Sequence, residues 1–194
     1  MTIFTLAGSP SLRSRSSFLL RYATQRLQSQ GLSTDAFGLR DIPAVDLIEG
    51  NYSGSAAKTF RHRVANAQAL LIATPVYKAS FAGGLKAILD LLDEKALVDK
   101  VILPIATGGS SAHLLALEYS LKPVLSALGA RHILAGVYAT DQQVTIDQDR
   151  FTISDDVRHR LDDTVDSLVK HVTTIPLSKG YDLGHLALNA RFSI

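Results

Sequence analysis

The stretch that decides the fold is an apolar run at residues 3–7, Ile-Phe-Thr-Leu-Ala, followed directly by Gly8-Ser9-Pro10-Ser11-Leu12-Arg13-Ser14-Arg15-Ser16-Ser17. An amphipathic segment begins near Phe18. A buried strand that ends at a glycine and leads into a helix through serines and arginines directs amide, hydroxyl and guanidinium donors to one point. A single serine is enough to cap a helix. The surplus of donors therefore predicts a site for a phosphate or a phosphate ester.

This loop contains neither of the two standard phosphate motifs. It lacks the Gly-x-Gly-x-x-Gly of dinucleotide-binding proteins and the Gly-Lys-Ser/Thr of P-loop nucleotidases. Without a loop lysine or a magnesium-binding hydroxyl, the loop suits the holding of a terminal phosphomonoester better than phosphoryl transfer. The pattern favours a mononucleotide, with flavin mononucleotide (FMN) as the leading candidate.

Composition limits the class of protein. The chain has 194 residues, of which 46% are hydrophobic and 20% charged, with a net charge of +2 and no cysteine. This length suits one domain with a full core, and the lack of cysteine excludes disulfide scaffolds, thiolate metal sites and cysteine nucleophiles. No signal peptide, membrane span or basic stripe is evident. We expect a cytoplasmic protein with no nucleic-acid or membrane partner.

Strand and helix patterns alternate along the chain. Strand-like runs lie at 2–7, 33–37, 69–74, 101–107 and 132–139, and helical periodicity fills 16–29, 55–67, 83–92, 111–128 and 154–171. Five strands separated by helices imply right-handed crossovers and a parallel sheet that is covered on both faces. We therefore expect an α/β fold of the flavodoxin-like type, a five-stranded parallel sheet in the order 2-1-3-4-5 with helices on both faces.

In such a sheet the ligand lies at the carboxyl ends of the strands. The third strand leads into Thr74-Pro75-Val76-Tyr77-Lys78, where we expect Pro75 to end the strand and the next three amides to face the crevice. The fourth strand leads into Thr107-Gly108-Gly109-Ser110-Ser111, where glycines let the backbone approach a ligand. The alternatives are a Tyr77 that merely packs on the rim and an ordinary glycine turn capped by a serine.

Together these motifs resemble the NAD(P)H-dependent FMN reductases. The likeness rests on Leu-Ala-Gly-Ser-Pro with Ser-Arg-Ser-Ser, on Thr-Pro-Val-Tyr-Lys with Gly-Gly-Leu-Lys-Ala-Ile-Leu-Asp, and on Leu-Pro-Ile-Ala-Thr-Gly-Gly-Ser with His-Leu-Leu-Ala-Leu-Glu-Tyr-Ser. It is strongest to the branch that serves alkanesulfonate monooxygenase. It covers residues 1–172, which we take as the reductase domain, and fades in residues 173–194, an arm of unknown role.

The resemblance implies an oligomer, a homodimer or homotetramer, that transfers hydride from NADPH to FMN and passes reduced FMN to a flavin-dependent monooxygenase. No 2′-phosphate site can be assigned, so NADH is an alternative donor. The residues that the resemblance implies are Ser9, Ser14, Arg15, Ser16 and Ser17 for the phosphate, Pro75, Val76, Tyr77 and Lys78 beside the isoalloxazine, and Thr107, Gly108 and Gly109 at its pyrimidine edge. Arg13 either contacts the phosphate or lies in solvent.

Hydride transfer between two cofactor rings needs no protein acid, base or nucleophile, so no catalytic residue is assigned. The histidines show no ligand spacing, and no metal site is expected. A hydrolase built on Ser110 or Ser111 with His113 is disfavoured, because the Gly-x-Ser-x-Gly elbow is absent. A quinone or azo reductase and a non-enzymatic flavin carrier remain open, although the balanced charge argues against the carrier.

The segment 111–128 is apolar on two sides. Leu114, Leu117, Leu121, Val124, Leu125 and Leu128 share one helical face, which we expect to lie on the sheet. Ala112, Leu115, Ala116 and Tyr119 fall opposite, where they predict a subunit interface. Pro123 cannot donate to the carbonyl of Tyr119, so a kink or a π-bulge is expected there.

Overall fold

A parallel sheet forms the centre of the protein in the computed structural model, which describes residues 1–11, 13–147 and 150–174. The strands are β1 (Thr2–Ala7), β2 (Ser33–Gly38), β3 (Ala69–Tyr77), β4 (Ser80–Phe81), β5 (Val101–Gly108), β6 (His132–Ile133), β7 (Val137–Thr140), β8 (Val144–Asp147) and β9 (Arg150–Ile153). The α-helices are α1 (Arg15–Ser29), α2 (Ala44–Glu49), α3 (Ser55–Ala65), α4 (Gly83–Leu89), α5 (Lys122–Ala127) and α6 (Asp155–Thr174).

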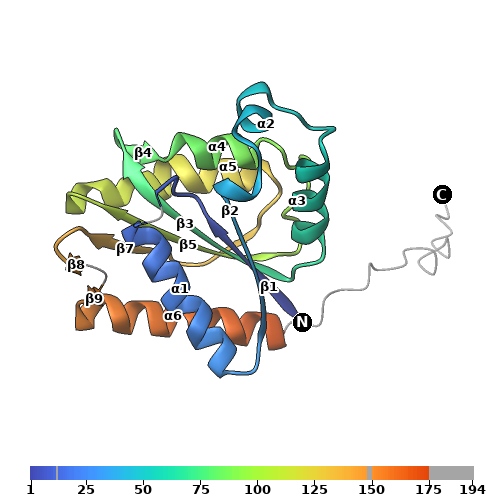
Figure 1. The fold of residues 1–194 in the computed structure, drawn as a ribbon. Coiled ribbons are helices and arrows are strands. Elements are labelled where there is room, and N and C mark those ends of the chain that lie inside the picture. Colours follow the sequence, from blue (N-terminus) through green and yellow to red (C-terminus); the bar gives the residue numbers. More distant parts are fainter. Residues whose placement is uncertain (12, 148–149, 175–194) are drawn as a thin grey trace, which may run out of the picture.

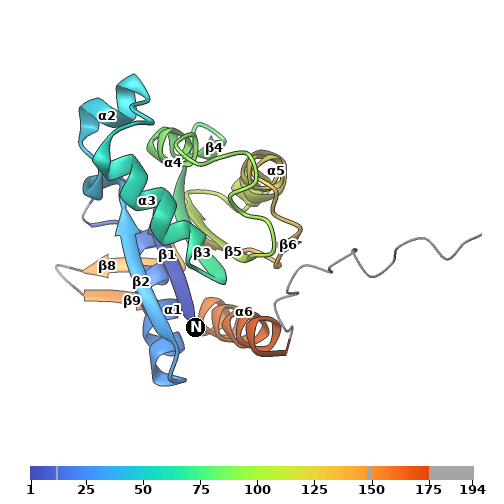
Figure 2. The ribbon, with the colours of Figure 1, turned by 90° about the vertical axis from the view of Figure 1, so that its right-hand side faces the viewer.

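The strand order is the flavodoxin-like order that the sequence predicts. The sheet runs β2-β1-β3-β5, and both β6 and β7 pair in parallel with β5 at the fifth position. Helices α1 and α6 lie side by side on one face, and α3, α4 and α5 cover the other (Figures 1 and 2). All eight residues of β5 are buried, as expected of a strand that is covered on both faces.

The fifth strand is broken in two beside Pro104. The amide of Leu134 donates to the carbonyl of Ile102 (2.9 Å), and that of Asp141 donates to the carbonyl of Gly108 (3.0 Å). The even-numbered residues of β5 therefore face the fifth strand, and Pro104 is the one among them without an N–H donor. The interruption between β6 and β7 lies there, so the single strand predicted at 132–139 is wrong in this detail.

Pro75 does not end the third strand as predicted, because β3 continues to Tyr77. The amide of Gly8 donates to the carbonyl of Ala73 (2.7 Å), so the odd-numbered residues of β3 face β1. At Pro75 strand β1 has already ended at Ala7. The proline thus faces the loop that follows β1, where the sheet requires no donor.

The predicted helix at 111–128 is not one continuous α-helix. A 3₁₀ turn (Ser111–Leu114) is followed by a π-helix (Leu117–Leu121) and then by α5. The distortion predicted around Tyr119 is confirmed. The same change of helical period overturns two predicted directions, because Leu114 is exposed (42%) and Ala116 is buried against its own chain (5%).

Sequence reasoning missed several short elements. These are α2, the β3–β4 hairpin, the two-stranded sheet of β8 and β9, and a 3₁₀ turn at Leu39–Asp41. None of the helices in the described ranges has the length and hydropathy needed to cross a membrane. From position 175 on, the predicted arm at 173–194 lies outside the described residues.

Candidate functional site

A pocket of about 200 Å³ opens where β1, β3 and β5 end. Its walls come from the loop between β1 and α1 with the first residue of α1, from the last residues of β3 and β5, and from one residue each after β5 and β7. The lining residues are Ser9, Ser11, Arg13, Ser14, Arg15, Pro75, Val76, Tyr77, Thr107, Gly108, Gly109 and Asp141. Hydroxyl and guanidinium groups therefore gather on the α1 side, and an apolar wall with two glycines lies on the β3–β5 side.

The first loop leaves the sheet through Gly8. A methyl group at this position would lie 2.9 Å from the carbonyl oxygen of Ala73 and 2.9 Å from Cβ of Leu85. Only glycine fits this approach, since backbone atoms stand in the way of any side chain. The hydroxyl of Ser9 then accepts a hydrogen bond from the amide of Ser11 (3.2 Å), which turns the loop around the pocket.

Ser14 caps α1 at the pocket. Its hydroxyl accepts from the amide of Ser17 (3.4 Å) and lies 2.9 Å from the hydroxyl of Ser16. Ser16 is fully buried and does not line the pocket, so it supports Ser14 instead of facing a ligand directly. Ser17 lines a neighbouring pocket of about 290 Å³ between α1 and β2.

Arg15 reaches from the first turn of α1 to the chain after β7. Its Nε donates to the carbonyl of Val144 (2.7 Å), and its terminal nitrogen Nη1 lies 3.7 Å from Oδ1 of Asp141. Both side chains are partly exposed, 35% for Arg15 and 48% for Asp141. The cation that could hold a phosphate is therefore shared with a carboxylate.

The β3–β4 hairpin forms the apolar wall. Val76 pairs with Phe81 and Tyr77 with Ser80, so only Lys78 and Ala79 make the turn. Both have positive φ, 50° and 61°, as the two-residue turns of hairpins require. The side chain of Tyr77 is half-exposed at the rim. Lys78 is exposed at the tip of the hairpin and does not line the pocket.

The floor beneath Gly108 is polar and close-packed. The hydroxyl of Tyr138 donates to the carbonyl of Ser110 (2.6 Å), which holds the glycine loop in place. Burial raises the pKa of this hydroxyl, and the charge of Asp141 adds to the shift. Nδ1 of His113 is buried here without a hydrogen-bond partner among the described residues. The floor thus leaves one nitrogen of His113 unsatisfied.

Nine of the twelve residues predicted for the cofactor line this one pocket, and Ser16, Ser17 and Lys78 do not. Sequence reasoning missed Ser11 and Asp141. Asp141 could have been found, because it follows the fifth strand at the same edge of the sheet. An acidic side chain does not fit the pattern of phosphate donors that marks this site in the sequence.

The chain matches the family described as "NADPH-dependent FMN reductase" over residues 1–145. It is 46% identical over 167 residues to the "FMN reductase (NADPH)" of Escherichia coli strain K12, covering 86% of this chain and 87% of the relative. It is 52% identical over 144 residues to the protein of the same name from Pseudomonas putida, covering 74% and 73%.

Among solved structures, the apo form of an NADH:FMN oxidoreductase called EMOB is similar. The TM-score is 0.79 at 31% identity, and the match covers 96% of this chain and 99% of that one. The pocket of hydroxyl, guanidinium and glycine groups at the carboxyl edge of the sheet agrees with these likenesses. The chain therefore belongs to the NADPH-dependent FMN reductases, an oxidoreductase family that acts on FMN with NADPH as the reductant.

Proposed function

We propose that this protein binds FMN with its phosphate at the start of α1 and its ring along the β3 and β5 loops, and reduces it with NADPH. The observation that carries the proposal is the pocket itself, which joins hydroxyl and guanidinium donors at one end to Val76, Tyr77 and two glycines at the other. The nicotinamide supplies the hydride. The protein's task is to place the two rings together and to exclude water.

Each part of the pocket has a separate task. The cap at Ser14 and the guanidinium of Arg15 bind the phosphate, where charge-assisted hydrogen bonds are the strongest polar contacts available. Val76 and Tyr77 support one side of the flavin ring. Gly108 and Gly109 let the backbone approach its polar edge, because no Cβ intervenes.

The turnover assay follows absorbance at the nicotinamide band. With NADPH in excess, oxidation is expected only when FMN is added, and the rate is expected to saturate with FMN. Riboflavin is the matched substrate without phosphate, and NADH is the matched donor. If neither nicotinamide is oxidised when FMN is added, the reductase assignment is wrong and a flavin carrier becomes the better explanation.

The phosphate assignment is tested by Arg15→Ala. Loss of one charge-assisted contact is expected to weaken the binding of FMN by about tenfold or more, while the affinity for riboflavin changes little. Arg158→Ala is the control, because this arginine lies on α6 outside the pocket and pairs with Asp155 at the surface. Equal weakening of FMN and riboflavin would contradict the placement of the phosphate beside Arg15.

We also propose that the protein is a homodimer or homotetramer that associates through the surface of Leu115 and Tyr119. Both side chains are exposed, 55% and 78%, although they are large and apolar. Tyr119→Ala is expected to lower the mass measured by light scattering and to change the FMN-dependent rate. Tyr52→Ala, at an exposed tyrosine elsewhere, is expected to leave both unchanged. If Tyr119→Ala also leaves both unchanged, this surface is not the interface.

Reduced FMN is a product that a second enzyme must use. We infer that it passes in the cytoplasm to a flavin-dependent monooxygenase that removes sulfite from organosulfonates. The motifs shared with the branch that serves alkanesulfonate monooxygenase support this. The test mixes the reductase, NADPH, FMN, a purified monooxygenase of that class and an alkanesulfonate. Sulfite release that requires the reductase supports the proposal, and FMN reduction without sulfite release contradicts this partner.

A further inference from the structure

Asp141 is an anion in a pocket that otherwise offers donors for a phosphate. It follows β7 directly, and its amide donates to the carbonyl of Gly108 (3.0 Å), which fixes it beside the glycine loop. Its Oδ2 lies 4.0 Å from where a methyl group at Gly109 would stand. The carboxylate thus lines the pocket close to both Gly109 and Arg15.

Asp141 and the chain after it hold Arg15. The Nε of Arg15 is bonded to the carbonyl of Val144, and Nη1 lies 3.7 Å from Asp141. A guanidinium offers five N–H donors in a rigid fork. When part of the fork is engaged by Asp141, a phosphate has to compete with that carboxylate for the same cation.

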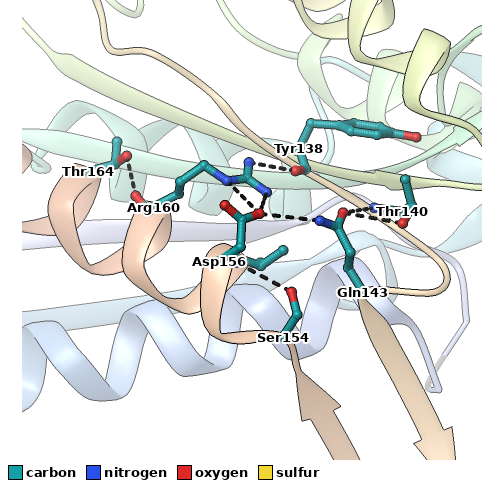
Figure 3. Close-up of polar contacts among 8 residues, drawn as sticks. Tyr138, Thr140, Gln143, Ser154, Asp156, Arg160 and Thr164 are labelled. Atoms are coloured by element: carbon teal, nitrogen blue, oxygen red, sulfur yellow. Dashed lines mark hydrogen bonds and ion pairs between the residues drawn. The ribbon is translucent and has the colours of Figure 1, made fainter.

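The turn that carries Asp141 is fixed by a polar network (Figure 3). The side-chain oxygen of Gln143 accepts from the amide of Thr140 (2.9 Å) and from its hydroxyl (3.2 Å). The Nε2 of Gln143 donates to Asp156 (3.3 Å), which also accepts from Arg160 (2.8 Å). These bonds join the turn to the start of α6, so the backbone of Asp141 has a defined place.

The network also reaches the floor of the pocket. Arg160 donates to the carbonyl of Tyr138 (2.9 Å; Figure 3). The hydroxyl of Tyr138 in turn donates to the carbonyl of Ser110. The position of Asp141 is therefore set by the same contacts that shape the glycine loop. With its backbone fixed in this way, the carboxylate of Asp141 stays close enough to the pocket to act on a charged ligand there.

We propose that Asp141 is a positioning residue that holds Arg15 and so weakens the binding of the flavin phosphate. This rests on the proposed placement of the phosphate at the start of α1. Differences in affinity between related complexes lie mostly in the dissociation rate. Asp141 therefore speeds the departure of flavin from an enzyme whose product has to leave for a second protein.

Asp141→Asn keeps the size of the side chain and removes its charge. We expect FMN to bind about three- to tenfold more tightly, as suits a partly exposed ion pair, with slower FMN dissociation in stopped flow. The affinity for riboflavin is expected to change by less than about twofold. Asp147→Asn is the control, because Asp147 lies exposed on β8 and does not line the pocket. This control variant is expected to leave the affinity for both FMN and riboflavin unchanged.

The Arg15→Ala background separates this effect from a general effect of charge. There, Asp141→Asn is expected to give no further tightening of FMN, because the guanidinium of Arg15, which Asp141 holds in the parent, is absent. Unchanged or weaker FMN binding in Asp141→Asn would overturn the inference, as would equal tightening of riboflavin or tightening that persists without Arg15. If the parent protein does not bind FMN at all, the proposed function fails together with this inference.

Discussion

Gly108 and Gly109 are neighbours in sequence with opposite surroundings, which makes alanine at each a sharp test of the pocket floor. A methyl group at Gly108 would lie 2.7 Å from the hydroxyl oxygen of Tyr138, 3.2 Å from Cβ of Val76 and 3.3 Å from Nδ1 of His113. At Gly109 a methyl group would have Oδ2 of Asp141 as its nearest neighbour, at 4.0 Å. Neither glycine is among those with positive φ, so both accept alanine as far as the backbone is concerned.

The free energies follow from these distances. Overpacking of a close-packed site costs about 1–3 kcal/mol, and replacing glycine by alanine returns about 0.4–1 kcal/mol by restricting the unfolded chain. Gly108→Ala is therefore expected to lower the free energy of unfolding by about 1–2 kcal/mol. Gly109→Ala is expected to leave it unchanged or to raise it slightly.

Urea denaturation measures the stabilities, and titration with FMN measures the effect on the pocket. FMN is expected to bind more weakly to Gly108→Ala, because relief of the contact requires Val76 or the glycine loop to move. In a Tyr138→Phe background the shortest contact is gone. Gly108→Ala is therefore expected to lower the free energy of unfolding by less in that background. Equal stabilities for the two alanine variants, or no relief in that background, would refute the reasoning.

Three further predictions concern stability. Ala79→Gly is expected to raise the melting temperature, because glycine accepts the positive φ at about 1 kcal/mol less cost; a lower melting temperature would contradict this. Burial lowers the pKa of Lys100, so the unfolded chain binds more protons just below 10.5. The free energy of unfolding should therefore rise relative to Lys100→Met as pH increases toward 10.5 in a denaturation series, and parallel curves would count against it. Hydrogen bonds from Arg26 and Gln30 lower the pKa of Asp166 below 3.8. The parent should thus lose stability relative to Asp166→Asn as pH falls through that range, and the same acid slope in both would exclude this cause.

The order of the sheet was predictable because its signals are local and repeated. Each central strand is a short apolar run that is bounded by turn residues. The connections between these strands are long and helical, which is typical of crossovers between parallel strands. The same logic identified the three segments at the carboxyl ends of β1, β3 and β5 that line the pocket. Strands β8 and β9 escaped prediction because each has only four residues, and about half of those residues are exposed.

The errors within the site have a different cause. The directions of Leu114 and Ala116 were derived from one helical period, and the π-helix changes that period between them and α5. Ser16 is fully buried with its hydroxyl bonded to that of Ser14, which the run of serines in the sequence does not indicate. Asp141 acts through Arg15, which is distant in sequence. Such pairings arise from tertiary structure and leave no local pattern to read.

Pro104 also specifies how the sheet assembles. The carbonyls of Ile102 and Gly108 accept from the fifth strand, and of the even-numbered residues of β5 on that side Pro104 is the one that has no N–H to donate. The chain matches this gap by leaving the sheet between β6 and β7, where Gly136 lies against the proline ring. Sliding the fifth strand by two residues would set one of its carbonyls against that ring and leave it without a donor. The missing N–H of Pro104 thus selects a single register for the edge strand. That register also determines where Asp141, which follows β7, lies in the pocket.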